Sequence, residues 1–182
     1  ERTTNGTGRV SEAGYVQLAR LDAGSWFQAR FAGERVWLLS QMLRAIPSRM
    51  RVNLELKRTS RRRALATRFL RIVRRAGVSR RLLVSSFDPR LLQLLRGSGL
   101  ARALICDRAP DASLRRAIRL RCDAWHPRDA LVTPRRIAAA HGAGLRVSAW
   151  TVDEPRRARQ LQRWGVDGVF TNDAARLRRA FP

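Results

Sequence analysis

An acidic and a basic side chain stand two residues apart near the end of an apolar run, where Glu55 is followed by Lys57. Residues at this spacing in a strand point to the same face of a sheet. A carboxylate there can bind a hard divalent cation, and a lysine can hold a phosphate oxygen as a point charge. The pair therefore suits phosphoryl chemistry. A simple internal ion pair is the plainer alternative, and the pair alone does not decide between them.

Other candidate groups stand at or near the ends of later apolar runs, where parallel α/β folds gather their reactive side chains. Phe87 and Trp150 could form an apolar wall for a substrate, although aromatic side chains at such positions also serve as core. His126 fits a pocket or a surface loop equally well. His141 lies near the end of a predicted helix, where a capping or dipole role is the ordinary one.

The elements that must position these groups are short apolar runs alternating with helical stretches. The predicted strands are Val52–Leu56, Leu82–Ser86, Ala103–Cys106, Asp123–Trp125, Leu145–Trp150 and Val166–Phe170. This alternation predicts a parallel sheet with right-handed crossovers. It fits part of a (β/α)₈ barrel or an open doubly wound sheet. No Gly-x-Gly-x-x-Gly fingerprint follows a strand, which disfavours dinucleotide binding.

The predicted helices are bounded by residues with capping chemistry. Gly77 follows an apolar-periodic stretch and suits a C-cap. Asp88 can cap the helix that Pro89 begins, and Thr133 stands at the start of another. Helices are predicted over residues 12–21, 38–46, 59–76, 88–95, 114–120, 133–142, 154–164 and 174–180.

The strongest compositional feature is a net charge of +24, because 37 arginines and a single lysine outnumber 14 acidic residues. The arginines occur as pairs spread over helical positions. Because arginine stems cover apolar surface while their heads stay wet, we favour a solvated basic exterior. A face for nucleic acid is the less favoured alternative.

The remaining composition is that of an ordinary globular domain. No apolar run reaches the length of a membrane span, and no targeting segment is visible, so a cytoplasmic location is expected. Cys106 and Cys122 have neither metal-ligand nor redox spacing and are predicted to be reduced thiols.

Several short motifs occur in an order that resembles the bacterial glycerophosphodiester phosphodiesterases. Each is weak alone, but their order covers nearly the whole chain. Residues 53–57 resemble the family's Asn-x-Glu-x-Lys strand, and residues 85–88 its Ser-Phe strand end. The other matching segments are residues 2–8, 21–27, 31–36, 144–145, 150–153 and 165–172.

The resemblance implies an α/β fold, a (β/α)₈ TIM barrel of the phosphodiesterase type that here lacks its first two strands. It makes residues 1–36 a small insertion segment between barrel units, and residues 37–182 barrel units three to eight. The family cleaves small-molecule glycerophosphodiesters to glycerol 3-phosphate and an alcohol, using Ca²⁺ or Mg²⁺. By the same resemblance Glu55 is a metal ligand, Lys57 contacts the substrate phosphate, and Phe87 and Trp150 line the substrate site.

The resemblance also implies that part of the catalytic machinery is absent from this sequence. The family's His-Arg-Gly strand, its Glu and Asp metal ligands on the first two strands and its second histidine are expected upstream of Glu1. His126 and His141 do not occupy those positions. No catalytic acid–base residue is therefore expected in this chain, and the chain alone is expected to be inactive. A non-enzymatic basic module that binds nucleic acid or other polyanions is the alternative.

Overall fold

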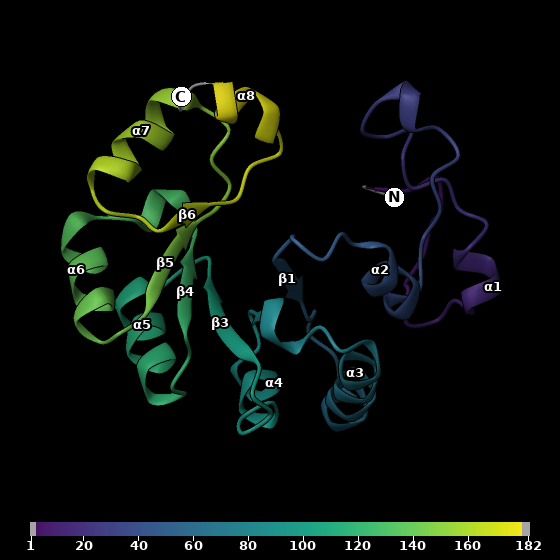
Figure 1. The fold of residues 1–182 in the computed structure, drawn as a ribbon, viewed down its shortest axis with the longest axis horizontal. Helices are drawn as coiled ribbons and strands as arrows, with labels where there is room; N and C mark the ends of the chain where they lie inside the picture. The colour runs from purple at the N-terminus through teal and green to yellow at the C-terminus, as the bar shows by residue number, and fades with distance from the viewer. Residues whose placement is uncertain (1–2, 180–182) are drawn as a thin grey trace. The chain divides into compact units, whose positions relative to one another are not determined.

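The computed structural model describes residues 3–179 and divides the chain into two compact units, residues 1–48 and residues 49–182 (Figure 1). The two units are described separately below, as the N-terminal unit and the barrel unit. Arg2 of the first motif and Ala180 of the last predicted helix lie outside the described residues. The assignment of residues 1–36 as an insertion between barrel units stays a prediction.

The N-terminal unit is built around the carboxylate of Asp22. This carboxylate accepts hydrogen bonds of 2.8 Å from the backbone N–H groups of Gly24, Ser25 and Gly33. These bonds hold the pKa of Asp22 well below its ordinary value. Gly24 cannot be replaced without a shift, because a Cβ there would meet the carbonyl oxygen of Phe31 at 1.8 Å. One side chain thus ties together the loop of residues 22–33.

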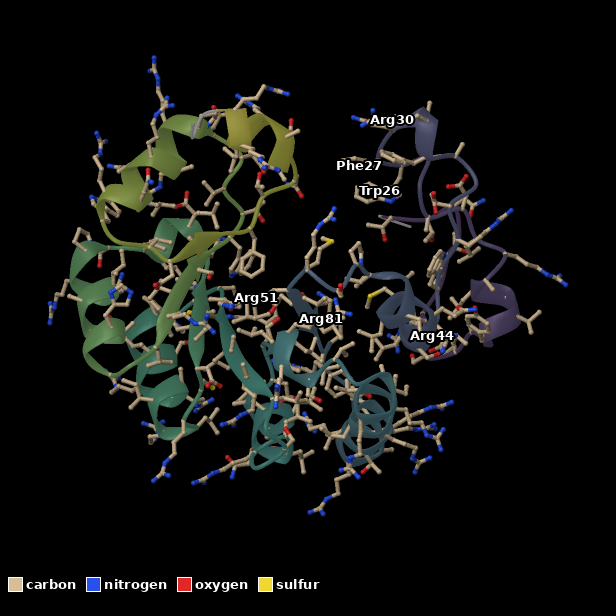
Figure 2. The ribbon with its side chains drawn as sticks, in the orientation of Figure 1. Trp26, Phe27, Arg30, Arg44, Arg51 and Arg81 are labelled. Atoms are coloured by element: carbon tan, nitrogen blue, oxygen red, sulfur yellow. The ribbon has the colours of Figure 1, made fainter. Side chains whose placement is uncertain are left out.

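The N-terminal unit contains little regular structure. Its elements are α1 (Tyr15–Leu18), a 3-10 helix (Ala29–Phe31) and α2 (Leu39–Ala45). The helix predicted over residues 12–21 is therefore a single turn, whereas the helix predicted over 38–46 is confirmed. Trp26 and Phe27 lie side by side on the loop with ring centroids 5.7 Å apart, and both are exposed (Figure 2).

The barrel unit contains one parallel sheet whose strands follow each other in chain order. They are β1 (Val52–Glu55), β2 (Leu82–Ser86), β3 (Ala101–Cys106), β4 (Ala124–Pro127), β5 (Arg146–Ala149) and β6 (Gly168–Val169). Each strand pairs in parallel with the next. A doubly wound sheet would reverse its strand order at a switch point. The consecutive order therefore confirms the barrel interpretation, and all six predicted strands are present.

The helices of the barrel unit follow the strands as predicted. They are α3 (Arg62–Ala76), α4 (Pro89–Leu94), α5 (Pro110–Arg119), α6 (Pro134–Gly142), α7 (Pro155–Arg163) and α8 (Ala174–Arg179), with short 3-10 helices at Ser79–Arg81 and Asp129–Leu131. Gly77 ends α3 in the left-handed region at φ 67°. Asp88 and Thr133 accept hydrogen bonds from backbone N–H groups in the first turns of α4 and α6. The predicted caps are thus confirmed.

The core of the barrel unit lies between the sheet and its outer helices. Figure 1 shows α5, α6 and α7 along the outer side of β3, β4 and β5. Trp125 of β4 is fully buried there, and its indole N–H donates to the Ser113 hydroxyl (3.2 Å). The two cysteines are free thiols, as predicted, and burial raises the pKa of Cys122 to about 11. Within residues 3–179, no helix combines the length and apolar character needed to cross a bilayer.

Candidate active site

The predicted carboxylate–lysine pair forms at the C-terminal end of β1. Lys57 Nζ donates to Glu55 Oε1 at 2.6 Å. The Glu55 side chain is 29% exposed, whereas that of Lys57 is 76% exposed. An ammonium has three donors, so Lys57 keeps N–H groups for a ligand while it pairs with Glu55. The ion pair and a phosphate-binding role are therefore compatible.

The two candidate aromatic residues also meet. The rings of Phe87, just after β2, and Trp150, just after β5, pack edge to face with centroids 5.6 Å apart. The Trp150 indole N–H donates to the carbonyl oxygen of His126 (2.9 Å), which fixes the ring. Strand ends that are far apart in sequence thus provide one apolar surface.

Polar side chains hold the loops that carry these aromatic rings. The Ser86 hydroxyl donates to the carbonyl oxygen of Leu56 (2.7 Å) and accepts from the Asp88 N–H (3.0 Å). On the other side, Asp153 accepts from the Thr171 hydroxyl and from the backbone and side-chain N–H groups of Asn172. The motif residues beside Phe87 and Trp150 therefore act as structural ties between neighbouring strand ends.

A cavity of about 690 Å³, which we call the Glu55 cavity, contains three of the four predicted site residues. Glu55, Lys57 and Phe87 line it, while Trp150 adjoins it only through the Phe87 ring. The cavity extends over the end of β3 to the first turns of α5. Its other lining residues are Arg58, Pro89, Leu104, Ile105, Cys106, Asp107, Arg108, Ala109, Ala112, Ser113 and Arg116.

The lining is positively charged, which sequence reasoning did not predict residue by residue. Four cations, Lys57, Arg58, Arg108 and Arg116, face two carboxylates, Glu55 and Asp107. Each carboxylate has one cationic neighbour, Lys57 at 2.6 Å and Arg108 at 3.5 Å. Arg58 and Arg116 are left in excess. A cavity with surplus positive charge favours an anionic group such as a phosphate.

The described residues do not form a divalent metal site by themselves. Ca²⁺ takes about six to eight oxygen ligands, many of them protein carboxylates and carbonyls, whereas Mg²⁺ is held by one or two carboxylates together with waters and substrate phosphates. Within residues 3–179, no three His, Cys, Asp or Glu side chains cluster closely enough to hold a metal ion. Glu55 offers one carboxylate, and Lys57 already donates to one of its oxygens. The residues present fit a single ligand and not a complete coordination shell.

Neither histidine lines the Glu55 cavity. His126 lies within β4, is only 3% exposed and packs against Phe170 with ring centroids 4.9 Å apart. The surface-loop interpretation of His126 is therefore wrong. Burial lowers the pKa of His126 to about 4, so its ring is neutral at pH 7. His141 lies in the last turn of α6, as predicted, and its Nε2 lies 2.9 Å from Asp167 Oδ2 in the loop before β6.

A consecutive parallel sheet with a charged cavity at its C-terminal edge is the arrangement of (β/α)₈ barrel enzymes. Comparison with known families agrees with this class. The chain belongs to the glycerophosphoryl diester phosphodiesterase family, whose model matches residues 1–176.

Individual relatives match over nearly the whole chain. A glycerophosphodiester phosphodiesterase of Caldanaerobacter subterraneus is 26% identical over 181 residues, which cover 97% of this chain and 74% of the relative. A solved structure of an Oleispira antarctica phosphodiesterase, in complex with the product sn-glycerol-3-phosphate, is 26% identical with a TM-score of 0.83 and covers 98% of this chain and 74% of that one. A glycerophosphodiester phosphodiesterase of Agrobacterium tumefaciens, also 26% identical, has a TM-score of 0.75 and covers 94% and 74%.

Proposed function

We propose that this chain forms part of an enzyme that hydrolyses a glycerophosphodiester to glycerol 3-phosphate and an alcohol. The observation that carries the proposal is the convergence of Glu55, Lys57 and Phe87 on one cationic cavity, in a chain of this family. The product bound in the Oleispira antarctica relative supports the same reaction.

Each cavity residue has a role that its chemistry suits. Lys57 would bind a phosphate oxygen, and Arg58 would add charge that stabilises the transferring group. The packed rings of Phe87 and Trp150 would cover the carbon atoms of the substrate. Glu55 would supply one ligand of the divalent cation, Ca²⁺ or Mg²⁺, that the resemblance implies. A complete metal site needs further oxygen ligands, which residues 3–179 do not bring to Glu55.

Proton transfer to the leaving oxygen is the step for which the described residues provide no histidine in the cavity. A general acid must lie within hydrogen-bond reach of the leaving oxygen. Within residues 3–179, both histidines lie outside the lining of the Glu55 cavity. We therefore infer that the acid–base groups are supplied from outside the described residues, and that the 182-residue chain does not turn over by itself.

The test is a phosphodiesterase assay with glycerophosphocholine and added Ca²⁺ or Mg²⁺. It compares the 182-residue chain with a chain that also carries any residues its gene encodes ahead of Glu1. We expect turnover only in a longer chain. In that chain Glu55→Gln or Lys57→Gln should lower kcat by at least about 100-fold, because the first removes a carboxylate ligand of the divalent cation and the second removes a positive charge directed at the reacting phosphate.

Glu154→Gln is the matched control for the loss of a carboxylate, because Glu154 pairs with Arg176 and does not line the Glu55 cavity. Full activity of Glu55→Gln in the longer chain would remove Glu55 from the mechanism. Activity in neither chain, with both proteins folded, would favour the alternative of a basic module that binds nucleic acid or another polyanion. The net charge of +24 supports that alternative, and it predicts binding that weakens steeply with salt. The expected cytoplasmic location also remains a prediction.

A further inference from the structure

A second cavity, of about 940 Å³, lies on the helical exterior of the barrel unit. It runs along α4, between the first turn of α3 and the second half of α5. Its lining residues are Ser60, Arg61, Arg62, Arg63, Ala64, Pro89, Arg90, Gln93, Leu94, Arg116, Arg119 and Leu120. We refer to this cavity as the arginine groove.

The arginine groove contains six guanidinium groups and no carboxylate among its lining residues. Arg62 is engaged, because its Nε donates to the buried Asp88 at 2.6 Å. The other five are exposed, and none forms an ion pair within residues 3–179. Figure 2 shows side chains with blue nitrogen tips projecting outward from α3, α4 and α5.

Several arginines elsewhere in the barrel unit are paired. Arg136 binds Asp111 at 2.9 Å, Arg157 binds Asp129 at 2.7 Å, and Arg176 contacts Glu154 at 3.2 Å. The arginine groove differs, because it concentrates positive charge with nothing in its lining to neutralise it. A guanidinium binds phosphate oxygens through parallel N–H donors, so the groove has the chemistry to bind phosphate.

The floor of the groove limits what kind of phosphate compound fits. Apolar atoms of Ala64, Pro89, Leu94 and Leu120 lie between the charged groups. Proteins that bind single-stranded nucleic acid stack bases on aromatic side chains, and no aromatic residue lines this groove. An aliphatic chain carrying phosphates matches the lining better than a nucleic acid does.

The arginine groove adjoins the candidate active site. Pro89 and Arg116 line both cavities. A substrate whose reacting phosphate lies near Lys57 could therefore extend past Arg116 toward Arg119 and Arg90. The cationic lining is then continuous from the reacting phosphate to the helical exterior.

We propose that the arginine groove is a binding subsite for further phosphate groups of the substrate. It selects glycerophosphodiesters whose alcohol carries at least one additional phosphate, such as short chains of glycerol phosphate units, over those with a zwitterionic alcohol such as choline. The proposal rests on the proposed function, because the Glu55 cavity must bind the reacting diester.

The test compares bis(glycerophospho)glycerol, which carries two phosphodiesters, with glycerophosphocholine in a catalytically competent chain. The double variant Arg90→Gln/Arg119→Gln removes two groove charges without touching the Glu55 cavity. We expect kcat/KM for bis(glycerophospho)glycerol to fall by about tenfold or more, since two charge-assisted hydrogen bonds are lost. For glycerophosphocholine the change should stay within about twofold, because no phosphate of this substrate reaches the groove.

Arg71→Gln/Arg75→Gln is the matched control, because it removes the same charge from exposed positions of α3 that line neither cavity. It should change neither kcat/KM value. An equal loss in the control and the groove variant would mean that net charge alone attracts the substrate, and would overturn the subsite. An unchanged kcat/KM for bis(glycerophospho)glycerol in the groove variant would overturn it as well.

Calorimetric titration of bis(glycerophospho)glycerol in EDTA separates this proposal from the proposed function. Without a divalent cation turnover is not expected, so the titration reports binding alone. We expect tighter binding to the wild-type chain and the control than to the groove variant. If neither substrate is hydrolysed but this difference appears, the proposed function fails and the subsite stands. If hydrolysis occurs and the difference is absent, only the subsite fails.

Discussion

The imidazole of His126 is a buried titratable group that should make stability depend on pH. Burial, aided by repulsion from Arg146, lowers the pKa of His126 to about 4. In the unfolded chain a histidine titrates near pH ~6.5, so between these values only the unfolded state binds the proton. The contribution of the neutral ring is complete above about pH 6.5 and is lost as the pH falls toward 4. At most it amounts to about 3 kcal/mol.

Urea unfolding at pH 7.5 and pH 4.5 measures this contribution. The wild-type chain should lose stability between these values, and His126→Phe, which keeps an aromatic ring next to Phe170, should lose about 2 to 3 kcal/mol less, because pH 4.5 still lies above the folded pKa. A ¹H NMR titration should place the His126 pKa well below its ordinary value. An unshifted pKa would refute the argument, because it would show that the ring is hydrated in the folded state.

For individual residues, the sequence predicted a contact correctly where a rule of spacing applied. The period of two in a strand predicted that Glu55 and Lys57 share a face, and their 2.6 Å contact agrees. Arg116 could not be predicted, because one arginine among 37 has no distinguishing signal. His126 was open to two interpretations because only the tertiary packing against Phe170 determines its burial.

The turn from β2 into α4 depends on a single carboxylate. Asp88 accepts from the Arg90 N–H at 3.0 Å and from Arg62 Nε at 2.6 Å. Burial alone would raise the pKa of Asp88, but these bonds outweigh it and hold the pKa below its ordinary value. The same turn carries Phe87, so this capping interaction also positions a candidate site residue.

We expect Asp88→Ala to destabilise the chain by about 2 kcal/mol, because it removes a helix cap and leaves the Arg62 guanidinium without its partner. Asp111→Ala, which breaks an exposed pair with Arg136, should cost less than about 1 kcal/mol. Urea unfolding at pH 7 compares the two. The Asp88 contribution is present above the ordinary aspartate pKa of about 4 and is lost as the pH falls below it. Equal effects of the two substitutions would contradict the assigned role of Asp88.

Elements were predicted better than their arrangement. Short apolar runs between capped helices were enough to locate all six strands of the barrel unit. The strand order was left open, because alternation fits a barrel and a doubly wound sheet equally. Only the pairing of each strand with the next decides it. The helix predicted over residues 12–21 is only one turn long in the structure. The N-terminal unit is organised instead by hydrogen bonds from loop N–H groups to the Asp22 carboxylate, and the helical spacing of apolar residues gives no information about such bonds.

For the molecule as a whole, the net charge and the open sheet edges have opposite effects on association between copies of the chain. Within residues 3–179 the sheet ends at β1 and β6, and each of these strands pairs on one side only. Unpaired strand edges are templates for association with another chain. The net charge of +24 opposes association through repulsion between copies. Salt screens this repulsion, whereas it leaves backbone hydrogen bonding largely intact.

We therefore expect the isolated 182-residue chain to self-associate increasingly as salt is raised. Sedimentation velocity at several protein concentrations, in low and high salt, measures this. Asn53→Pro in β1 should reduce the association, because it removes a backbone donor from the open edge, whereas the N–H of Leu56, on the other side of the strand, bonds to the carbonyl oxygen of Ser85 in β2. Circular dichroism must show that the fold is retained. Arg71→Gln serves as a surface control that leaves both edges intact. A chain that stays monomeric in high salt and melts cooperatively would show that the edges of β1 and β6 are protected.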